Sequence, residues 1–144
     1  EMCIRDSVES MRRLPVESAR HEPPRVAVSR SHKSPELAEY IEELRKSHPD
    51  LEVVEQGSSY KFCLLAEGAV DYYFRTTSTY EWDTAAGELI LSEAGGETLS
   101  LPDYRPLRYN KTDLVNPWFF CRARKMPGCR PEAEMMVGEC SAAD

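Results

Sequence analysis

Three short polar segments contain side chains suited to binding a phosphate, a base or a metal ion. They are Ser29–His32 (SRSH), Gly57–Lys61 (GSSYK) and Glu81–Ala86 (EWDTAA). The first two offer hydroxyls, an imidazole and an ammonium that could hold a phosphate or a base, and a glycine turn before a helix also presents N–H groups to an anion. Asp83, in the third segment, could bind Mg2+, which takes one or two protein carboxylates together with phosphate oxygens and water.

Each segment also has a purely structural interpretation. Residues 29–32 could be a polar turn before a helix that Ser34 caps. Residues 57–61 could be an ordinary connection from a strand to a helix, with Lys61 in solvent. Asp83 could simply be a carboxylate at the start of a helix, where the helix dipole favours negative charge. Residue types alone leave both interpretations open for all three segments.

The elements that would position these segments alternate between strands and helices. We predict strands at 25–29, 51–55 and 69–74, with further short candidates at 98–101, 107–109 and 118–121. We predict helices at 35–46, 60–67 and 82–94, and the packing residues available to the last are Ala85, Ala86, Leu89, Ile90 and Ala94. This alternation favours a layered α/β fold, in which ligand sites collect at the carboxyl ends of strands. Residues 1–24 and 122–144 lack the pattern, and we predict a tail or linker for the first segment and a tail for the second.

The composition is that of a globular protein and disfavours several classes of partner. Hydrophobic residues make up 41% of the 144 residues and the formal net charge is -7, so general electrostatics argues against nucleic acid and anionic membranes. No apolar run approaches the ~20 residues of a membrane helix and no signal-peptide pattern begins the chain, so we expect a cytoplasmic protein. The five cysteines include no C-x-x-C pair, which disfavours a zinc site or a disulfide framework. The oligomeric state stays open.

One longer stretch resembles a known family. Thr79–Gly96 (TYEWDTAAGELILSEAGG) is similar to the second signature of the inositol monophosphatase superfamily, W-D-x-A-A followed by A-G-G. Within that superfamily, Ser29–His32 and Gly57–Cys63 resemble the S-R-S-H and G-S-S-x-K-F-C elements of the 3'(2'),5'-bisphosphate nucleotidases of the CysQ type. The resemblance covers residues 25–121.

The resemblance implies a fold, an activity and site residues. The fold would be the carboxyl-terminal half of an α/β/α sandwich, with a mixed sheet flanked by helices. The activity would be a Mg2+-dependent removal of the 3'-phosphate from 3'-phosphoadenosine 5'-phosphate, which gives AMP and phosphate. Asp83 would bind the metal and face the substrate phosphate. The small-molecule nucleotide would contact Ser29, His32, Gly57 and Lys61. Arg75 also matches the family, without an assigned role.

The first signature of the same family is absent from the sequence. The D-P-[IL]-D-G-T segment and the glutamate before it, which hold most of the catalytic metals in the family, have no counterpart in the 144 residues. Two-metal phosphate chemistry needs cations at both the attacking and the leaving oxygen, so we expect an incomplete fragment that is inactive alone. Two alternatives stay open: an inositol monophosphatase or other sugar-phosphate phosphatase, and a non-catalytic nucleotide-binding remnant.

Overall fold

A five-stranded mixed sheet forms the centre of the fold in the computed structural model, which describes Leu14 and residues 21–31 and 33–124. The strand order is β2-β1-β3-β7-β5. β1 runs parallel to β2 and β3, whereas β7 runs antiparallel to both β3 and β5. The strand bounds are β1 Arg25–Ser29, β2 Glu52–Gln56, β3 Tyr72–Arg75, β5 Glu97–Ser100 and β7 Phe119–Arg122.

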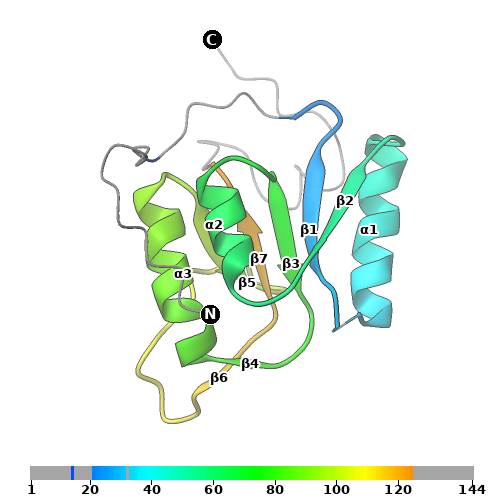
Figure 1. The fold of residues 1–144 in the computed structure, drawn as a ribbon. Helices are drawn as coiled ribbons and strands as arrows, with labels where there is room; N and C mark the ends of the chain where they lie inside the picture. Colours follow the sequence, from blue (N-terminus) through cyan, green and yellow to red (C-terminus); the bar gives the residue numbers. More distant parts are fainter. Residues whose placement is uncertain (1–13, 15–20, 32, 125–144) are drawn as a thin grey trace.

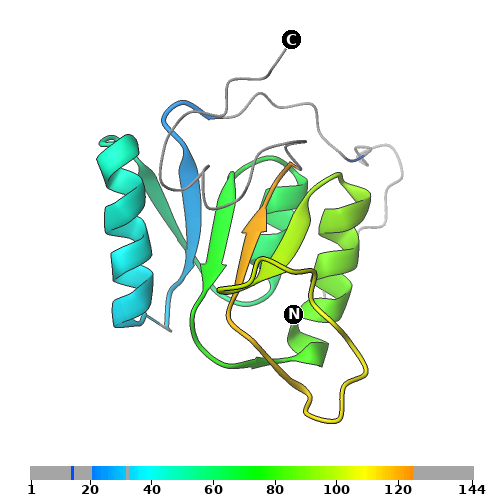
Figure 2. The same cartoon turned by 180° about the vertical axis from the view of Figure 1, so that it is seen from behind.

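Three helices cover the two faces of this sheet (Figures 1 and 2). They are α1 (Pro35–Ser47), α2 (Tyr60–Ala66) and α3 (Glu81–Glu93). Because side chains alternate along a strand, Val26 and Val28 of β1 join the core under α1, while Ala27 joins the core under α2 and α3. The result is an α/β/α arrangement with a mixed sheet flanked by helices, which confirms the predicted fold class.

Local signals in the sequence set the ends of the first two helices. Ser34 caps α1, since its side chain accepts a hydrogen bond from the Leu37 N–H at 3.2 Å, and Pro35 occupies the first turn. Gly68 follows α2 with φ +69°, a left-handed conformation that glycine adopts without steric cost. The structural interpretation of Ser34 is therefore correct.

The packing face of α3 differs from the one we predicted. Ala85, Ala86, Leu89 and Ile90 are exposed, whereas Ala94, just after the helix, is buried as predicted. The buried residues within the helix are Glu81, Thr84, Gly87 and Leu91. A Cβ added at Gly87 would lie 2.6 Å from the Phe62 ring of α2. Because α2 and α3 lie this close together, only the smallest side chains fit between them. The steric limit at Gly87 therefore determines which face of α3 is buried, and the positions of the large apolar residues do not.

Two further predictions about strands are wrong. Residues 107–109 form no strand, because this segment leaves the sheet after an isolated bridge between Leu99 and Pro106 and turns toward the start of α3. Residues 75–81, where we predict no strand, contain a short one, β4 (Thr79–Tyr80), which pairs antiparallel with β6 (Val115–Asn116).

The predicted tails fall largely outside the described residues, so the domain limits stay a prediction. Of the part that is described, the His21 ring nitrogen lies 3.0 Å from the Asp71 carboxylate, and Arg122 forms an ion pair with Glu97. Within residues 21–31 and 33–124, none of the helices has the length and apolar character to cross a membrane.

Candidate functional site

A pocket of about 470 Å³ opens where β1 and β3 end. Its walls come from the last residues of these strands, from the turn that leads into α2, and from the segment that joins β4 to α3. The lining residues are Ser29, Ser58, Ser59, Lys61, Phe62, Tyr73, Arg75, Ser78, Thr79, Tyr80, Trp82, Asp83, Thr84 and Phe119. Carboxyl ends of strands are where α/β folds commonly bind ligands.

The pocket brings together three of the five residues predicted for the site. Ser29, Lys61 and Asp83 all line it, although they come from three different elements. His32 lies outside the described residues. Gly57 is not in the lining and a Cβ there would meet nothing within 4 Å, whereas the neighbouring Ser58 lines the pocket and has φ 60°. The left-handed residue of this turn is therefore Ser58.

Lys61 is buried, which contradicts the alternative that it lies in solvent. Its side chain is 1% exposed. Its ammonium donates hydrogen bonds to the backbone carbonyls of Gln56 (3.0 Å) and Ser58 (2.7 Å) and lies 4.9 Å from the centre of the Tyr73 ring. Burial, followed by the nearby charge of Arg75, lowers the pKa of Lys61 to about 8. The lysine therefore braces the turn while it keeps a positive charge at neutral pH.

Arg75 supplies a second cation at the pocket. Its guanidinium contacts the Thr77 carbonyl from Nε at 3.3 Å and the Ser78 carbonyl from Nη2 at 3.4 Å. These are long hydrogen bonds to a loop, and the side chain is only partly buried. Two cations, Lys61 and Arg75, thus line the same pocket as one carboxylate, Asp83, in a chain whose net charge is -7. This local excess of positive charge suits an anionic ligand.

Asp83 lies in the first turn of α3 and serves as a helix cap. Its Oδ2 atom accepts a hydrogen bond from the Tyr80 N–H at 2.9 Å, while the side chain remains exposed at the pocket. The structural interpretation of Asp83 is therefore correct, and it leaves the carboxylate accessible to a ligand. The described residues contain no group of three His, Cys, Asp or Glu side chains that could hold a metal ion. Asp83 is the one carboxylate among the residues that line the pocket.

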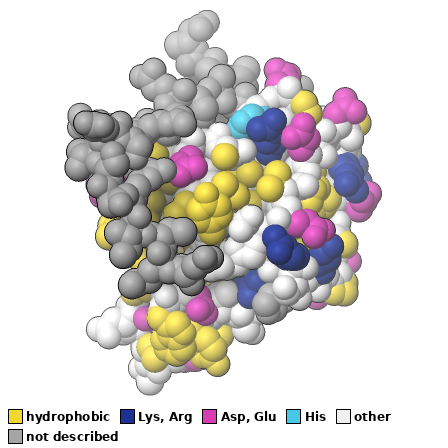
Figure 3. Space-filling model, viewed as in Figure 1, with side chains coloured by type: hydrophobic (Ala, Val, Ile, Leu, Met, Phe, Trp, Pro, Cys, Tyr) yellow, Lys and Arg dark blue, Asp and Glu magenta, His cyan; other side chains and the backbone are white. Residues whose placement is uncertain are grey.

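An exposed aromatic pair forms the rim of the pocket. Trp82 is 64% exposed and Tyr80 45%, and their rings stack with centroids 4.6 Å apart and an interplanar angle of 6°. Figure 3 shows apolar side chains gathered at the lower edge of the molecule, where Figure 1 places β4 and the start of α3. Sequence reasoning missed this rim because Trp82 counted only as the first residue of a helix. The alternation of aromatic residues in YEW was the available signal.

Comparison with known proteins agrees with these features. The inositol monophosphatase family pattern matches residues 8–118. The chain is 42% identical over 104 residues to the 3'(2'),5'-bisphosphate nucleotidase CysQ of Salmonella typhimurium, a match that covers 67% of this chain and 38% of that protein. It is also 56% identical over 69 residues to an uncharacterized protein in the pss 5' region of Rhizobium leguminosarum bv. phaseoli, which covers 44% of this chain and 72% of that protein.

A solved structure gives the same result. The chain superposes on CysQ from Bacteroides thetaiotaomicron, a bacterial member of the inositol monophosphatase family, with a TM-score of 0.73 and 47% sequence identity, over 83% of this chain and 44% of that chain. The chain therefore spans less than half the length of these CysQ relatives. The family pattern nevertheless covers most of the 144 residues, and the chain belongs to the inositol monophosphatase family.

Proposed function

We propose that this chain forms the nucleotide-binding wall of a Mg2+-dependent 3'(2'),5'-bisphosphate nucleotidase. The substrate is 3'-phosphoadenosine 5'-phosphate, and the products are AMP and phosphate. The observation that carries the proposal is a single pocket that joins Ser29, Lys61 and Asp83 from β1, α2 and α3. Within the proposal, residues 25–121 are the nucleotide-binding half of a phosphatase domain that works in the cytoplasm.

The charges and hydroxyls of the pocket support a ligand with two phosphates. Lys61 and Arg75 are the cations, and the serine hydroxyls of residues 29, 58 and 59 line the same space. An ammonium has three N–H donors, and the two carbonyls of the turn take two from Lys61. The third donor is available for a charge-assisted hydrogen bond to a phosphate oxygen, about twice as strong as a neutral one.

The aromatic rim supports a nucleotide in preference to a sugar phosphate. Trp82 presents a large flat face that is already held parallel to Tyr80. A nucleobase stacked on an aromatic side chain gains about 1–3 kcal/mol, and an inositol ring has no π-face with which to make the same contact. We therefore assign the adenine base to this rim and the phosphates to the cations deeper in the pocket.

Mg2+ fits the proposal through one residue of this chain. Asp83 would contribute one carboxylate oxygen beside the substrate phosphate, in keeping with the few protein ligands that this ion takes. When bound, the metal supplies a Lewis acid that polarises the phosphoryl group and activates water. The residues of this chain contribute something else, namely binding and orientation of the nucleotide, which is the positioning part of catalysis.

A second candidate is a nucleotide-binding protein without catalytic activity. The observation that favours it is the isolation of Asp83: in the described part of the chain, no other carboxylates join it in a metal-binding group. Both candidates share the same pocket and ligand. They differ only in turnover.

Calorimetry on the 144-residue chain tests the shared claim. The proposed substrate, 3'-phosphoadenosine 5'-phosphate (also named adenosine 3',5'-bisphosphate), should bind more tightly than inositol 1-phosphate. Mg2+ should increase the affinity for the nucleotide. Equal or tighter binding of inositol 1-phosphate would overturn the assignment. Sustained phosphate release from the nucleotide in the same samples would exclude a non-catalytic protein.

A further inference from the structure

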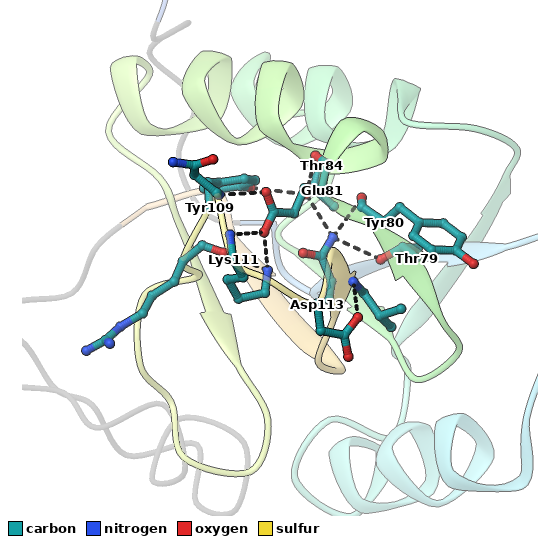
Figure 4. A network of polar contacts seen from close by, with 11 residues as sticks. Thr79, Tyr80, Glu81, Thr84, Tyr109, Lys111 and Asp113 are labelled. Carbon is teal, nitrogen blue, oxygen red and sulfur yellow. Dashed lines mark hydrogen bonds and ion pairs between the residues drawn. The ribbon is translucent and has the colours of Figure 1, made fainter.

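Behind the pocket wall, a buried carboxylate holds the loop of residues 108–111 against the start of α3. Glu81 is the first residue of α3 and is 8% exposed. Its carboxylate accepts hydrogen bonds from the backbone N–H groups of Asn110 (2.7 Å) and Lys111 (3.1 Å) and from the Lys111 ammonium (2.5 Å), as Figure 4 shows. Glu81 does not line the pocket. Its carboxylate is thus directed to the loop and not into the pocket.

Asn116 holds the same segment from β6. Its side-chain N–H groups donate to the Tyr80 carbonyl (2.9 Å) and to the hydroxyls of Thr84 (3.0 Å) and Thr79 (3.3 Å). The backbone adds a contact, since the Glu81 N–H donates to the Leu114 carbonyl at 3.0 Å. β6 and the loop of residues 108–111 therefore clamp the first turn of α3, through Asn116 and Glu81.

The residues on either side of Glu81 form one wall of the pocket. Residues 78–80 precede it and residues 82–84 follow it in the lining. Asp83 is tied to Tyr80 by the cap hydrogen bond, so both move with the first turn of the helix. A shift of that turn would redirect the Asp83 carboxylate and the aromatic rim together.

We propose that Glu81 is a positioning residue that fixes the direction of Asp83. The ligand that Asp83 meets rests on the proposed function, whereas the geometry of the clamp does not. A carboxylate matches the three donors that converge here because its two oxygens can accept about four hydrogen bonds. An amide of the same shape would keep one oxygen and turn its NH2 group toward one of the donors. Glu81→Gln therefore opens the clamp with almost no change in volume.

The test compares Glu81→Gln with a matched control, Glu97→Gln. Glu97 forms an ion pair with the buried Arg122 at the opposite end of the sheet, away from the pocket. Both variants lose a paired carboxylate, so both should melt at a lower temperature than the unsubstituted chain. The Tyr80 amide resonance reports the hydrogen bond to Asp83 without any ligand. It should shift and exchange faster in Glu81→Gln and stay unchanged in Glu97→Gln.

Affinity for adenosine 3',5'-bisphosphate is the second readout. We expect Glu81→Gln to raise Kd about fivefold, which corresponds to about 1 kcal/mol at 25 °C, while Glu97→Gln leaves Kd unchanged. An unchanged Tyr80 amide in Glu81→Gln overturns the proposal, as does equal weakening by both variants. If the unsubstituted chain does not bind the nucleotide, the proposed function fails, and the Tyr80 amide still decides the role of Glu81. If Glu81→Gln does not fold, Lys111→Met, which keeps the two backbone donors, should give a smaller shift of the same amide, and no shift overturns the proposal.

Discussion

Replacing Lys61 with methionine should weaken nucleotide binding at neutral pH and leave it nearly unaffected at high pH. Methionine keeps the apolar stem in its buried position and removes the ammonium. A hydrogen bond to a charged group contributes about 1.5–3 kcal/mol. The loss of one phosphate contact should therefore raise Kd by at least tenfold at pH 7.

Stability is a poorer readout of the same change because two effects oppose each other. The variant leaves the carbonyls of Gln56 and Ser58 without their donor, which costs about 1–3 kcal/mol for each buried acceptor that water does not reach. It also removes a buried charge, and the fall in the pKa of Lys61 from 10.5 to about 8 corresponds to about 3 kcal/mol against the charged form. The two effects largely cancel, and the free energy of unfolding should change by no more than about 3 kcal/mol.

The pH dependence identifies the group responsible. The ammonium of Lys61 binds phosphate while it is charged, so affinity should be full below the pKa of about 8 and should fall as the pH rises through that value. The stability of the unsubstituted chain moves in the other direction. The folded state has the lower pKa, so the unfolded chain binds more protons between pH 8 and 10.5, and stability rises across that window. Arg75 remains charged throughout and adds no step.

The assay is calorimetric titration with adenosine 3',5'-bisphosphate at several pH values between 6.5 and 9.5. Lys46→Met is a matched control, since Lys46 lies on α1, is largely exposed and pairs with Glu43. The control should reproduce the affinity and the pH profile of the unsubstituted chain. Normal nucleotide binding by Lys61→Met at pH 7, or an affinity of this variant that still falls through pH 8, would exclude Lys61 as the phosphate contact.

Three further substitutions test other parts of the site. Asp83→Asn keeps an oxygen that can accept a hydrogen bond from the Tyr80 N–H, so the fold should persist with a loss of about 0.5 kcal/mol of stability from the helix dipole. Calorimetry should show that Mg2+ no longer increases nucleotide affinity, and a retained Mg2+ effect would exclude Asp83 as a metal ligand. Trp82→Ala should weaken the nucleotide by about 1–3 kcal/mol and leave inositol 1-phosphate unchanged, and equal losses for both ligands would argue against stacking. Gly87→Ala places a methyl group 2.6 Å from the Phe62 ring and should cost about 1–3 kcal/mol of stability by overpacking, which chemical denaturation measures; an unchanged midpoint would show that the two helices separate without cost.

The elements with strong local signals could be predicted from the sequence. Ser34 and Pro35 mark the start of α1, and the β-branched run at residues 25–29 gives the central strand β1. Residues 107–109 look like a strand because they are short and partly apolar. Their conformation depends instead on the following loop, in which Asn110 and Lys111 donate hydrogen bonds to Glu81. These two residues are 29 and 30 positions away from Glu81 in the sequence. Such a contact leaves no local pattern.

The candidate site could be predicted in part for the same reason. Ser29, Lys61 and Asp83 each lie where a strand ends or a helix begins, which is visible in the sequence, and the resemblance to the family motifs singles them out as site residues. The burial of Lys61 is not visible in the sequence, because it depends on the direction of the Gln56 and Ser58 carbonyls and on the position of the Tyr73 ring. The sequence therefore predicts which residues line the pocket better than it predicts the burial and the hydrogen bonds of each one.

The most direct test of the central claim is an amide NMR titration of the 144-residue chain with adenosine 3',5'-bisphosphate in the presence of Mg2+. We expect saturable shifts at Ser29, Ser58, Lys61 and Asp83, which line one pocket, and much smaller shifts with inositol 1-phosphate at the same concentration. Shifts confined to other surfaces, or no preference between the two ligands, would contradict it.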